Sequence, residues 1–255
     1  MAGGAREGGQ SVVSRALTLL GAFNSDHPHL TLSELSRAAG LPLATAHRLL
    51  GELVTWGAVV RRRDGAYEIG RRLWDLGLLA PVQVELREAA APFLQDIHAA
   101  TRDTVHLAVR DGIKALYVER ISGRESVPVV SQVGSRLPLH TTGVGKVLLA
   151  FAPSEVVLEA AAHLTRETRH SIIEPGRLAR DLAEVRRRGY ARTNEEMSLG
   201  ACSLAVPVVD RSGEVVAAVG IVVPPHRRNS ARLVPALQVA AHGISRQMQP
   251  GHTFR

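Results

Sequence analysis

Residues 31 to 69 constrain the fold of this chain more than any other stretch, because helix, turn and hairpin signals follow one another within it. Leu32, Leu35 and Ala39 recur at helical spacing, and residues 40–42, Gly-Leu-Pro, end that helix. A second helix is expected next, with one apolar face made by Leu43, Ala46, Leu49, Leu50 and Leu53. Two short helices joined by a glycine-containing turn predict a helix-turn-helix, whose second helix enters the major groove of DNA.

The residues after the second helix predict a β-hairpin. Asp64-Gly65 separates two β-prone runs, residues 58–63 and 66–69, and Asp-Gly in this position is a strong hairpin signal. A helix-turn-helix followed by a hairpin is a winged helix. We expect contacts with base edges from the start of the second helix and with phosphates or the minor groove from the hairpin, made by Thr45, His47, Arg48, Arg61, Arg62 and Arg63. The alternative is a small helical subdomain with a solvated, charged hairpin.

Composition agrees with an anionic partner but is weaker evidence than the local pattern. The chain has 255 residues, is 45% hydrophobic and carries a formal charge of +7, which suits one large or two modest globular domains. Residues 1–80 hold nine arginines and seven acids, a net of only +2. The clustering of arginines after residue 60 therefore indicates more than the total charge.

The same composition excludes other classes of protein. Cys202 is the only cysteine, so no internal disulfide framework is possible. The first ten residues lack the apolar core of a signal peptide, and no window approaches 18 uninterrupted apolar residues. We expect a soluble, cytoplasmic protein with no membrane partner.

The chain is expected to contain two domains. We predict a disordered, glycine-rich tail over residues 1–10, a winged helix-turn-helix over 11–70, a linker helix over 71–82 and a second domain over 83–250, with the boundary near Pro81. A first helix from residue 11 should use the face Val13, Leu17, Leu20 and Phe23. The linker helix is apolar enough to pack against either a partner subunit or the second domain.

The second domain is predicted to be α+β, with an antiparallel sheet and helices at its start and end. Period-two alternation indicates strands at residues 104–109, 115–121, 190–194, 202–209 and 215–223, with a short extended segment at 127–130. Helices are expected at residues 86–100, 143–150, 154–162, 176–188 and 233–248, and Gly189 should end the fourth of them.

The start of the helix after residue 140 is the best candidate for a ligand site. Residues 141–145 read Thr-Thr-Gly-Val-Gly, so unpaired backbone N–H groups and the positive end of the helix dipole would meet a closely approaching anion. The alternative is a capped helix whose glycines serve tight packing. Lys146 lies in no P-loop pattern, so it is interpreted as a surface or structural lysine.

Other reactive residues give weaker signals, and no catalytic residue, metal or cofactor is expected. Cys202 has no general base near it in the sequence, and a buried cysteine usually behaves as a small hydrophobe. His106, His140 and Cys202 match no metal-ligand spacing and are interpreted as core or pocket residues. Glu195-Glu196 is read as structural, and the arginines at 180–188 as a solvated face in preference to a second nucleic-acid surface.

Three motifs in order show that the chain resembles the IclR family of bacterial transcription regulators over nearly its whole length. They are residues 41–59, LPLATAHRLLGELVTWGAV; residues 134–150, GSRLPLHTTGVGKVLLA; and residues 189–224, GYARTNEEMSLGACSLAVPVVDRSGEVVAAVGIVVP. The resemblance implies a winged helix and a GAF-like effector domain in a homodimer or homotetramer. It also implies binding to an inverted-repeat operator in double-stranded DNA, controlled by a small carboxylate or aromatic metabolite.

The resemblance also implies the positions of an effector pocket. Carried over position by position, they are Ser126, Val129, Thr142, Gly143, Val144, Thr193, Cys202, Ser203, Gly220 and Val222. Members that bind glyoxylate-type ligands have serines where this chain has Gly220 and Val222, so a larger and less polar effector, an aromatic acid, fits better. The rival functions are a ligand-independent DNA-binding protein and an enzyme built on a GAF-like domain.

Overall fold

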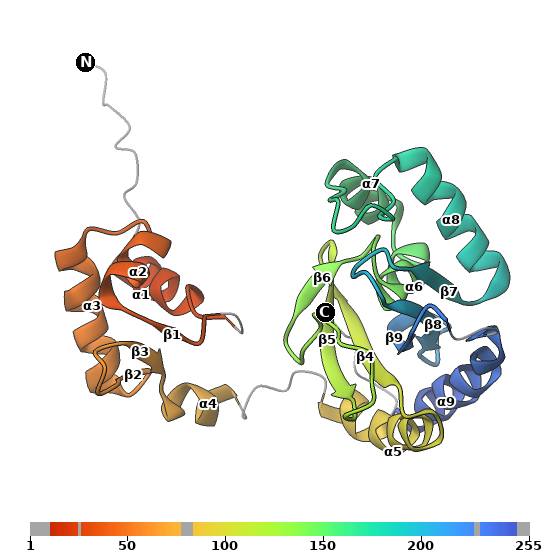
Figure 1. Cartoon of the computed structure of the whole chain (residues 1–255), viewed down its shortest axis with the longest axis horizontal. Helices are drawn as coiled ribbons and strands as arrows, with labels where there is room; N and C mark the ends of the chain where they lie inside the picture. Colours follow the sequence, from red (N-terminus) through yellow and green to blue (C-terminus); the bar gives the residue numbers. More distant parts are fainter. Residues whose placement is uncertain (1–10, 25–26, 78–83, 227–229, 249–255) are drawn as a thin grey trace. The chain divides into compact units, whose positions relative to one another are not determined.

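The computed structural model describes residues 11–24, 27–77, 84–226 and 230–248. The chain divides into two compact units, Met1–Val82 and Gln83–Arg255 (Figure 1). The predicted disordered tail at residues 1–10, the end of the predicted linker helix and the predicted boundary near Pro81 lie outside the described residues. Within the described residues, no helix is long and apolar enough to cross a membrane.

The first unit contains the helix-turn-helix and hairpin that the sequence predicts. Its helices are α1 (Val12–Gly21), α2 (Leu32–Ala38), α3 (Leu43–Trp56) and α4 (Arg71–Gly77), and its strands are β1 (His29–Leu30), β2 (Val59–Arg61) and β3 (Tyr67–Ile69). The strands form an antiparallel sheet in the order β1-β3-β2. The wing is therefore the β2–β3 hairpin, and β1 pairs with β3, which is the central strand of the sheet.

Local chemistry fixes where the two helices of the motif begin and turn. Thr31 and Glu34 form a capping box: the Thr31 backbone N–H donates to the Glu34 carboxylate over 2.7 Å, and the Glu34 N–H donates to the Thr31 hydroxyl over 3.4 Å. Gly40 has a φ of +62°, a left-handed conformation that glycine adopts without steric cost. The chain can therefore reverse between α2 and α3 within four residues.

The core of the first unit differs from the sequence prediction at two helices. Leu35, Ala46, Leu49 and Leu50 are buried as expected, but the residue of α1 that is fully buried is Leu19. The predicted α1 face is wrong at Val13 and Leu17, which are 67% and 60% exposed, whereas Leu20 and Phe23 are partly buried against the core as predicted. Leu43 of α3 is 51% exposed. Apolar residues surround α1 on several sides, so periodicity alone could not select the face that α2 and α3 cover.

The second unit is built on a six-stranded antiparallel sheet in the order β6-β5-β4-β9-β8-β7. The strands are β4 (Thr104–Asp111), β5 (Lys114–Ile121), β6 (Arg136–Pro138), β7 (Ala191–Asn194), β8 (Cys202–Val209) and β9 (Val215–Val223). The helices are α5 (Val84–Thr101), α6 (Gly143–Ala150), α7 (Ser154–Ala162), α8 (Pro175–Arg188) and α9 (Val234–Gln247), with a 3-10 turn η1 (Ser230–Leu233). The predicted α+β fold with an antiparallel sheet is confirmed.

The sheet separates two apolar cores. Helices α5 and α9 cover one face, where alternate strand residues such as Leu107, Leu204 and Ile221 are buried. Helix α6 packs on the other face and is itself covered by α7 and α8 (Figure 1). All eight residues of α6 are buried, which explains its almost entirely apolar and glycine composition.

Two elements between β5 and α6 differ from expectation. The segment 127–130 forms no strand, whereas residues 136–138 do, as β6 at the edge of the sheet beside β5. Pro138 is tolerated in β6 because an edge strand leaves one side of its backbone unpaired. Gly189 ends α8 with a φ of +74°, as the sequence predicts.

Candidate functional site

The start of α3 presents the side chains expected to contact DNA bases. His47 and Arg48 are exposed and Thr45 is half-buried, while Ala46, Leu49 and Leu50 on the opposite side of the helix are buried in the core. Burial of one side of α3 leaves the other side open along the first two helical turns. This arrangement is the one a recognition helix needs, with its N-terminal side chains free to reach base edges.

The arginines of the wing are not equivalent. The Arg62 guanidinium is paired within the wing, with Nη1 2.9 Å from Glu68 Oε2 and Nε 3.3 Å from Asp64 Oδ2. The Arg61 guanidinium lies 5.9 Å from the centre of the Tyr67 ring. For Arg63, which is exposed, no ion pair is found in the described part of the chain. Arg63 is therefore the wing cation whose charge is least compensated within the unit.

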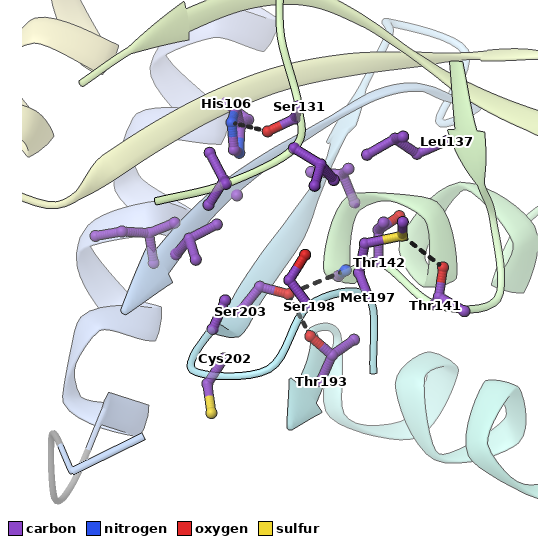
Figure 2. Close-up of a pocket in the computed structure, with 18 of the residues that line it drawn as sticks. His106, Ser131, Leu137, Thr141, Thr142, Thr193, Met197, Ser198, Cys202 and Ser203 are labelled. Carbon is purple, nitrogen blue, oxygen red and sulfur yellow. Dashed lines mark hydrogen bonds between the residues drawn. The ribbon is translucent and has the colours of Figure 1, made fainter. Parts of the chain in front are cut away.

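The second unit contains a cavity, partly open to solvent, between the sheet and the start of α6. Strands β4, β5, β8 and β9, the segment before β6 and the loop between β7 and β8 contribute to its walls (Figure 2). Its lining residues are His106, Tyr117, Val129, Val130, Ser131, Leu137, Thr141, Thr142, Gly143, Val144, Thr193, Met197, Ser198, Ala201, Cys202, Ser203, Leu204, Gly220, Ile221 and Val222.

One side of the cavity is polar because α6 begins there. Thr142 caps the helix by accepting the Gly145 N–H over 3.1 Å. The Gly143 N–H donates to the Ser203 hydroxyl over 3.1 Å, and the Ser203 and Thr193 hydroxyls are 2.5 Å apart. A short chain of hydroxyls on β7 and β8 therefore extends from the positive end of the α6 dipole into the cavity.

Two glycines at this site permit close packing. A Cβ on Gly143 would lie 2.7 Å from Ser203 Oγ, and a Cβ on Gly220 would lie 2.7 Å from Val144 Cγ1. Both distances are shorter than real Cβ contacts allow, so a side chain at either position would displace a residue that lines the cavity. The glycines let α6 approach β8 and β9 closely enough to form the cavity wall.

A second polar pair lines the cavity away from α6. His106 Nε2 lies 2.8 Å from the Ser131 hydroxyl, and both residues are only 3% exposed. Burial lowers the pKa of His106 to about 3, and the positive charge of Arg120 is a second, smaller cause of this shift. The imidazole is therefore neutral near pH 7. The ring of Tyr117 meets the imidazole edge to face at 4.9 Å and orients it.

The structure brings together all of the sequence-predicted pocket positions except Ser126. The hydroxyl of Ser126 donates to the Arg102 carbonyl over 2.8 Å and accepts the Gly123 N–H over 3.0 Å, which holds it in the loop after β5 and outside the cavity. Cys202 is in the wall, but its thiol packs in the core on the α5–α9 face and donates to Asn194 Oδ1 over 2.9 Å. Figure 2 shows the sulfur pointing away from the cavity. Adjacent strand residues face opposite ways, so Ser203 and Cys202 cannot both point inward.

Several lining residues were not among the predicted positions, notably Tyr117, Ser131, Leu137 and Met197. Tyr117 lies on β5 on the same face as the predicted strand residues, so its period-two position was a usable signal. Ser131 and Met197 lie outside helices and strands, where periodicity gives no information.

Beneath the cavity, Lys146 forms a buried ion cluster. Its ammonium lies 2.6 Å from Asp181 Oδ2 on α8 and 2.8 Å from Glu196 Oε2, and the Lys146 side chain is 1% exposed. Of the two interpretations of Lys146, surface or structural, the structural one is correct. Glu196 is the structural residue that the sequence indicates, and Asp181, whose side chain is 31% exposed, joins α8 to this cluster.

The remaining candidates for metal binding or catalysis do not assemble. His140 is held by the backbone of Thr165 instead. Its Nε2 lies 2.9 Å from the Thr165 carbonyl oxygen, which would accept from a protonated Nε2, and 3.2 Å from the Thr165 nitrogen, which would donate to an unprotonated one. Among the residues that the structure describes, no group of three His, Cys, Asp or Glu side chains is placed to hold a metal ion. Burial also raises the pKa of the Cys202 thiol, which disfavours the thiolate that a nucleophile requires.

A helix-turn-helix unit followed by a unit that contains a cavity defines a class of two-domain transcription regulators. Residues 12–63 match the model of the IclR helix-turn-helix domain, and residues 80–246 match that of the bacterial transcriptional regulator IclR C-terminal domain. The chain belongs to the IclR family of bacterial transcription regulators. It therefore combines a DNA-binding domain with an effector domain in a family of regulators, not of enzymes.

Relatives and solved structures agree over nearly the full length. The chain is 32% identical to the HTH-type transcriptional regulator XynR of Escherichia coli over 243 residues, which cover 92% of this chain and 96% of XynR. It is 33% identical to KdgR of Dickeya chrysanthemi over 244 residues, covering 92% of this chain and 80% of KdgR. An IclR homologue from Microbacterium hydrocarbonoxydans, crystallised with 4-hydroxybenzoate, is 34% identical with a TM-score of 0.87, covering 93% of this chain and 98% of the other.

Proposed function

We propose that this regulator binds an inverted-repeat operator through α3 and the wing, as a homodimer or homotetramer, and that an aromatic carboxylate in the cavity changes its affinity for that operator. The observation that carries the ligand part is the hydroxyl chain of Ser203 and Thr193 at the start of α6, inside a cavity whose other lining residues are mostly apolar. The homologue that binds 4-hydroxybenzoate supports the ligand class.

The carboxylate belongs at the α6 side of the cavity. Helix N-termini favour anions because their first N–H groups lack helical partners and carry partial positive charge. The Gly143 N–H donates to Ser203, and for the Val144 N–H no hydrogen-bond partner is found among the described residues. The contact between Ser203 and Thr193 takes up one of their two hydroxyl protons, and the other can turn toward an arriving carboxylate, which also accepts from the Val144 N–H.

The rest of the ligand meets apolar wall. Val129, Leu137, Val144 and Val222 line the cavity and offer contact area without hydrogen bonds. Gly220 contributes no side chain at all, so the strand β9 adds no polar group at this point. One anionic end and one apolar body favour an aromatic or branched acid over a small polar acid such as glyoxylate.

Gly143→Val tests the site of the effector. A side chain at this position enters the space beside Ser203, so we expect the variant to keep operator binding and to lose its response to benzoate or 4-hydroxybenzoate. The operator would be a duplex selected from a random pool by the wild-type protein, with the response measured as a shift in its dissociation constant. Thr193→Val is the milder second variant, which removes one hydroxyl at nearly constant volume. A wild-type response retained by both variants would place the effector elsewhere.

Arg48→Ala tests the DNA part of the proposal. Loss of a base contact should cost about 1–3 kcal/mol on the selected operator and relax sequence preference at the contacted base pair. Half-sites should lie about 10 bp apart or a multiple of that, because each winged helix contacts one face of the duplex. An unchanged footprint for Arg48→Ala, or specific binding of a single half-site by a monomer in light scattering, would contradict the proposal.

A further inference from the structure

The side of the cavity away from α6 contains a polar pair that binding of a carboxylate does not require. His106 comes from β4 and Ser131 from the segment before β6, two elements that do not contribute to the start of α6. Figure 2 shows this pair on one side of the cavity and the Thr193 and Ser203 hydroxyls on the other. The apolar residues Leu137 and Val144 also line the cavity.

Such a pair is costly unless its hydrogen-bonding capacity is used. Both side chains are 97% buried, and polar groups in a buried, mostly apolar environment are normally hydrogen-bonded as fully as their chemistry permits. A serine hydroxyl has one donor and two acceptor positions, and the contact with His106 Nε2 uses one of these. The Ser131 hydroxyl therefore has capacity left for a group inside the cavity that it lines.

The pair is also uncharged. The imidazole is neutral near pH 7 because burial disfavours its protonated form and the positive charge of Arg120 disfavours it further. Arg120 lies opposite His106 on β5 but is not among the residues that line the cavity. A neutral donor–acceptor pair matches a neutral hydroxyl, whereas a second carboxylate would be desolvated at a wall whose lining residues include no Lys or Arg.

We propose that His106 and Ser131 form a second recognition point of the cavity, which binds a hydroxyl on the ring of an aromatic carboxylate held by its acid group at α6. This inference rests on the proposed function and specifies its ligand as a hydroxylated aromatic acid. The hydroxyl donates to, or accepts from, the Ser131–His106 pair, while the carboxylate accepts the one free proton of the Ser203–Thr193 pair and the N–H groups at the start of α6.

The test is isothermal titration calorimetry of the full-length protein with benzoate, 4-hydroxybenzoate and terephthalate. The wild type should bind 4-hydroxybenzoate about tenfold more tightly than benzoate, the effect of one good hydrogen bond in a desolvated site. Ser131→Ala should remove this preference, measured as the ratio of the 4-hydroxybenzoate and benzoate affinities of the same variant, and His106→Leu should do the same. Ser126→Ala is the matched control, a serine of the same loop whose hydroxyl is outside the cavity.

The outcomes separate this inference from the proposed function. If none of the three acids binds the wild type, the proposed function fails and this inference fails with it. If benzoate and 4-hydroxybenzoate bind equally well to the wild type, or if Ser131→Ala keeps the preference, the aromatic acid site stands and the hydroxyl recognition point is wrong. Tighter binding of terephthalate than of 4-hydroxybenzoate would show that this side of the cavity accepts a second carboxylate, and would also overturn the inference. Because the comparison within the wild type needs no variant, a Ser131→Ala protein that fails to fold leaves the test intact.

Discussion

Replacing Lys146 with methionine should destabilise the second unit strongly. The side chain is 1% exposed, and its ammonium lies 2.6 Å from Asp181 and 2.8 Å from Glu196. Methionine fills a similar volume but leaves the carboxylates of Asp181 and Glu196 without their cation. The Glu196 side chain is only 10% exposed, so water cannot readily replace that cation. Removing one partner of a buried ion pair costs about 3–5 kcal/mol. For a unit of this size that corresponds to a fall of roughly 6–20 °C in the unfolding temperature.

The chain provides its own control, because Lys114 is its only other lysine. Lys114 is half-buried at the start of β5, and Lys114→Met should change the free energy of unfolding by no more than about 0.5 kcal/mol. Differential scanning calorimetry of both full-length variants against the wild type measures the difference in the transition of the second unit. A Lys146→Met protein within 1 kcal/mol of Lys114→Met, on the order of the experimental error, would refute the argument from buried charge.

The pH dependence gives a second check on the same argument. Burial raises the pKa of Glu196, and the nearby Lys146 charge opposes that rise. Without Lys146, the folded-state pKa of this carboxyl should lie further above its unfolded value. A carboxyl with a raised pKa stabilises the fold at low pH and loses that contribution as the pH rises through the folded pKa. The deficit of Lys146→Met should therefore be larger at pH 7.5 than at pH 5.5, and an equal or smaller deficit at pH 7.5 would contradict the assignment.

Three further predictions concern the wing, the cavity histidine and the cavity wall. Arg63→Ala should weaken binding to all duplexes alike and reduce the slope of log affinity against log salt concentration by about one. Arg62→Ala should have a smaller effect, since Arg62 is already paired with Glu68. Fluorescence anisotropy at several salt concentrations compares the two variants. The pKa of His106 is about 3 in the folded protein and 6.5 in the unfolded chain, so its contribution to the free energy of unfolding is complete above pH 6.5 and is lost as the pH falls toward 3. Urea titrations of the wild type should therefore show a loss of about 2 kcal/mol between pH 7 and pH 5, and those of His106→Gln should lack that loss. Gly220→Ala should cost about 1–3 kcal/mol and weaken benzoate binding, because its Cβ would lie 2.7 Å from Val144 Cγ1; calorimetry showing unchanged affinity and stability would disprove the close approach.

Much of the fold could be read from the sequence because local signals agree with the tertiary arrangement. Asp64-Gly65 specifies the wing hairpin, and period-two alternation gives the bounds of β8 and β9 as the structure has them. Thr142 and Gly143 mark the start of α6, since a threonine cap and the first helical residues are adjacent in sequence. The strand period also places Ser203, Gly220 and Val222 on a common face, so the strand side of the cavity was predictable.

The sequence by itself determined the helix-turn-helix, the wing, the antiparallel sheet and the glycine-rich helix start, because each depends on neighbours within a few residues. Tertiary structure alone decided which face of α1 is buried, that Arg62 is paired, and that Ser131 joins His106 at the cavity while Ser126 does not. It also decided that Lys146 meets Asp181 and Glu196 in the interior. The Arg62 pairs lie within the wing hairpin and depend on how its side chains turn. The other contacts join residues far apart in the chain or in irregular loops, where no periodicity links them, so their partners exist only once the sheet and helices have packed.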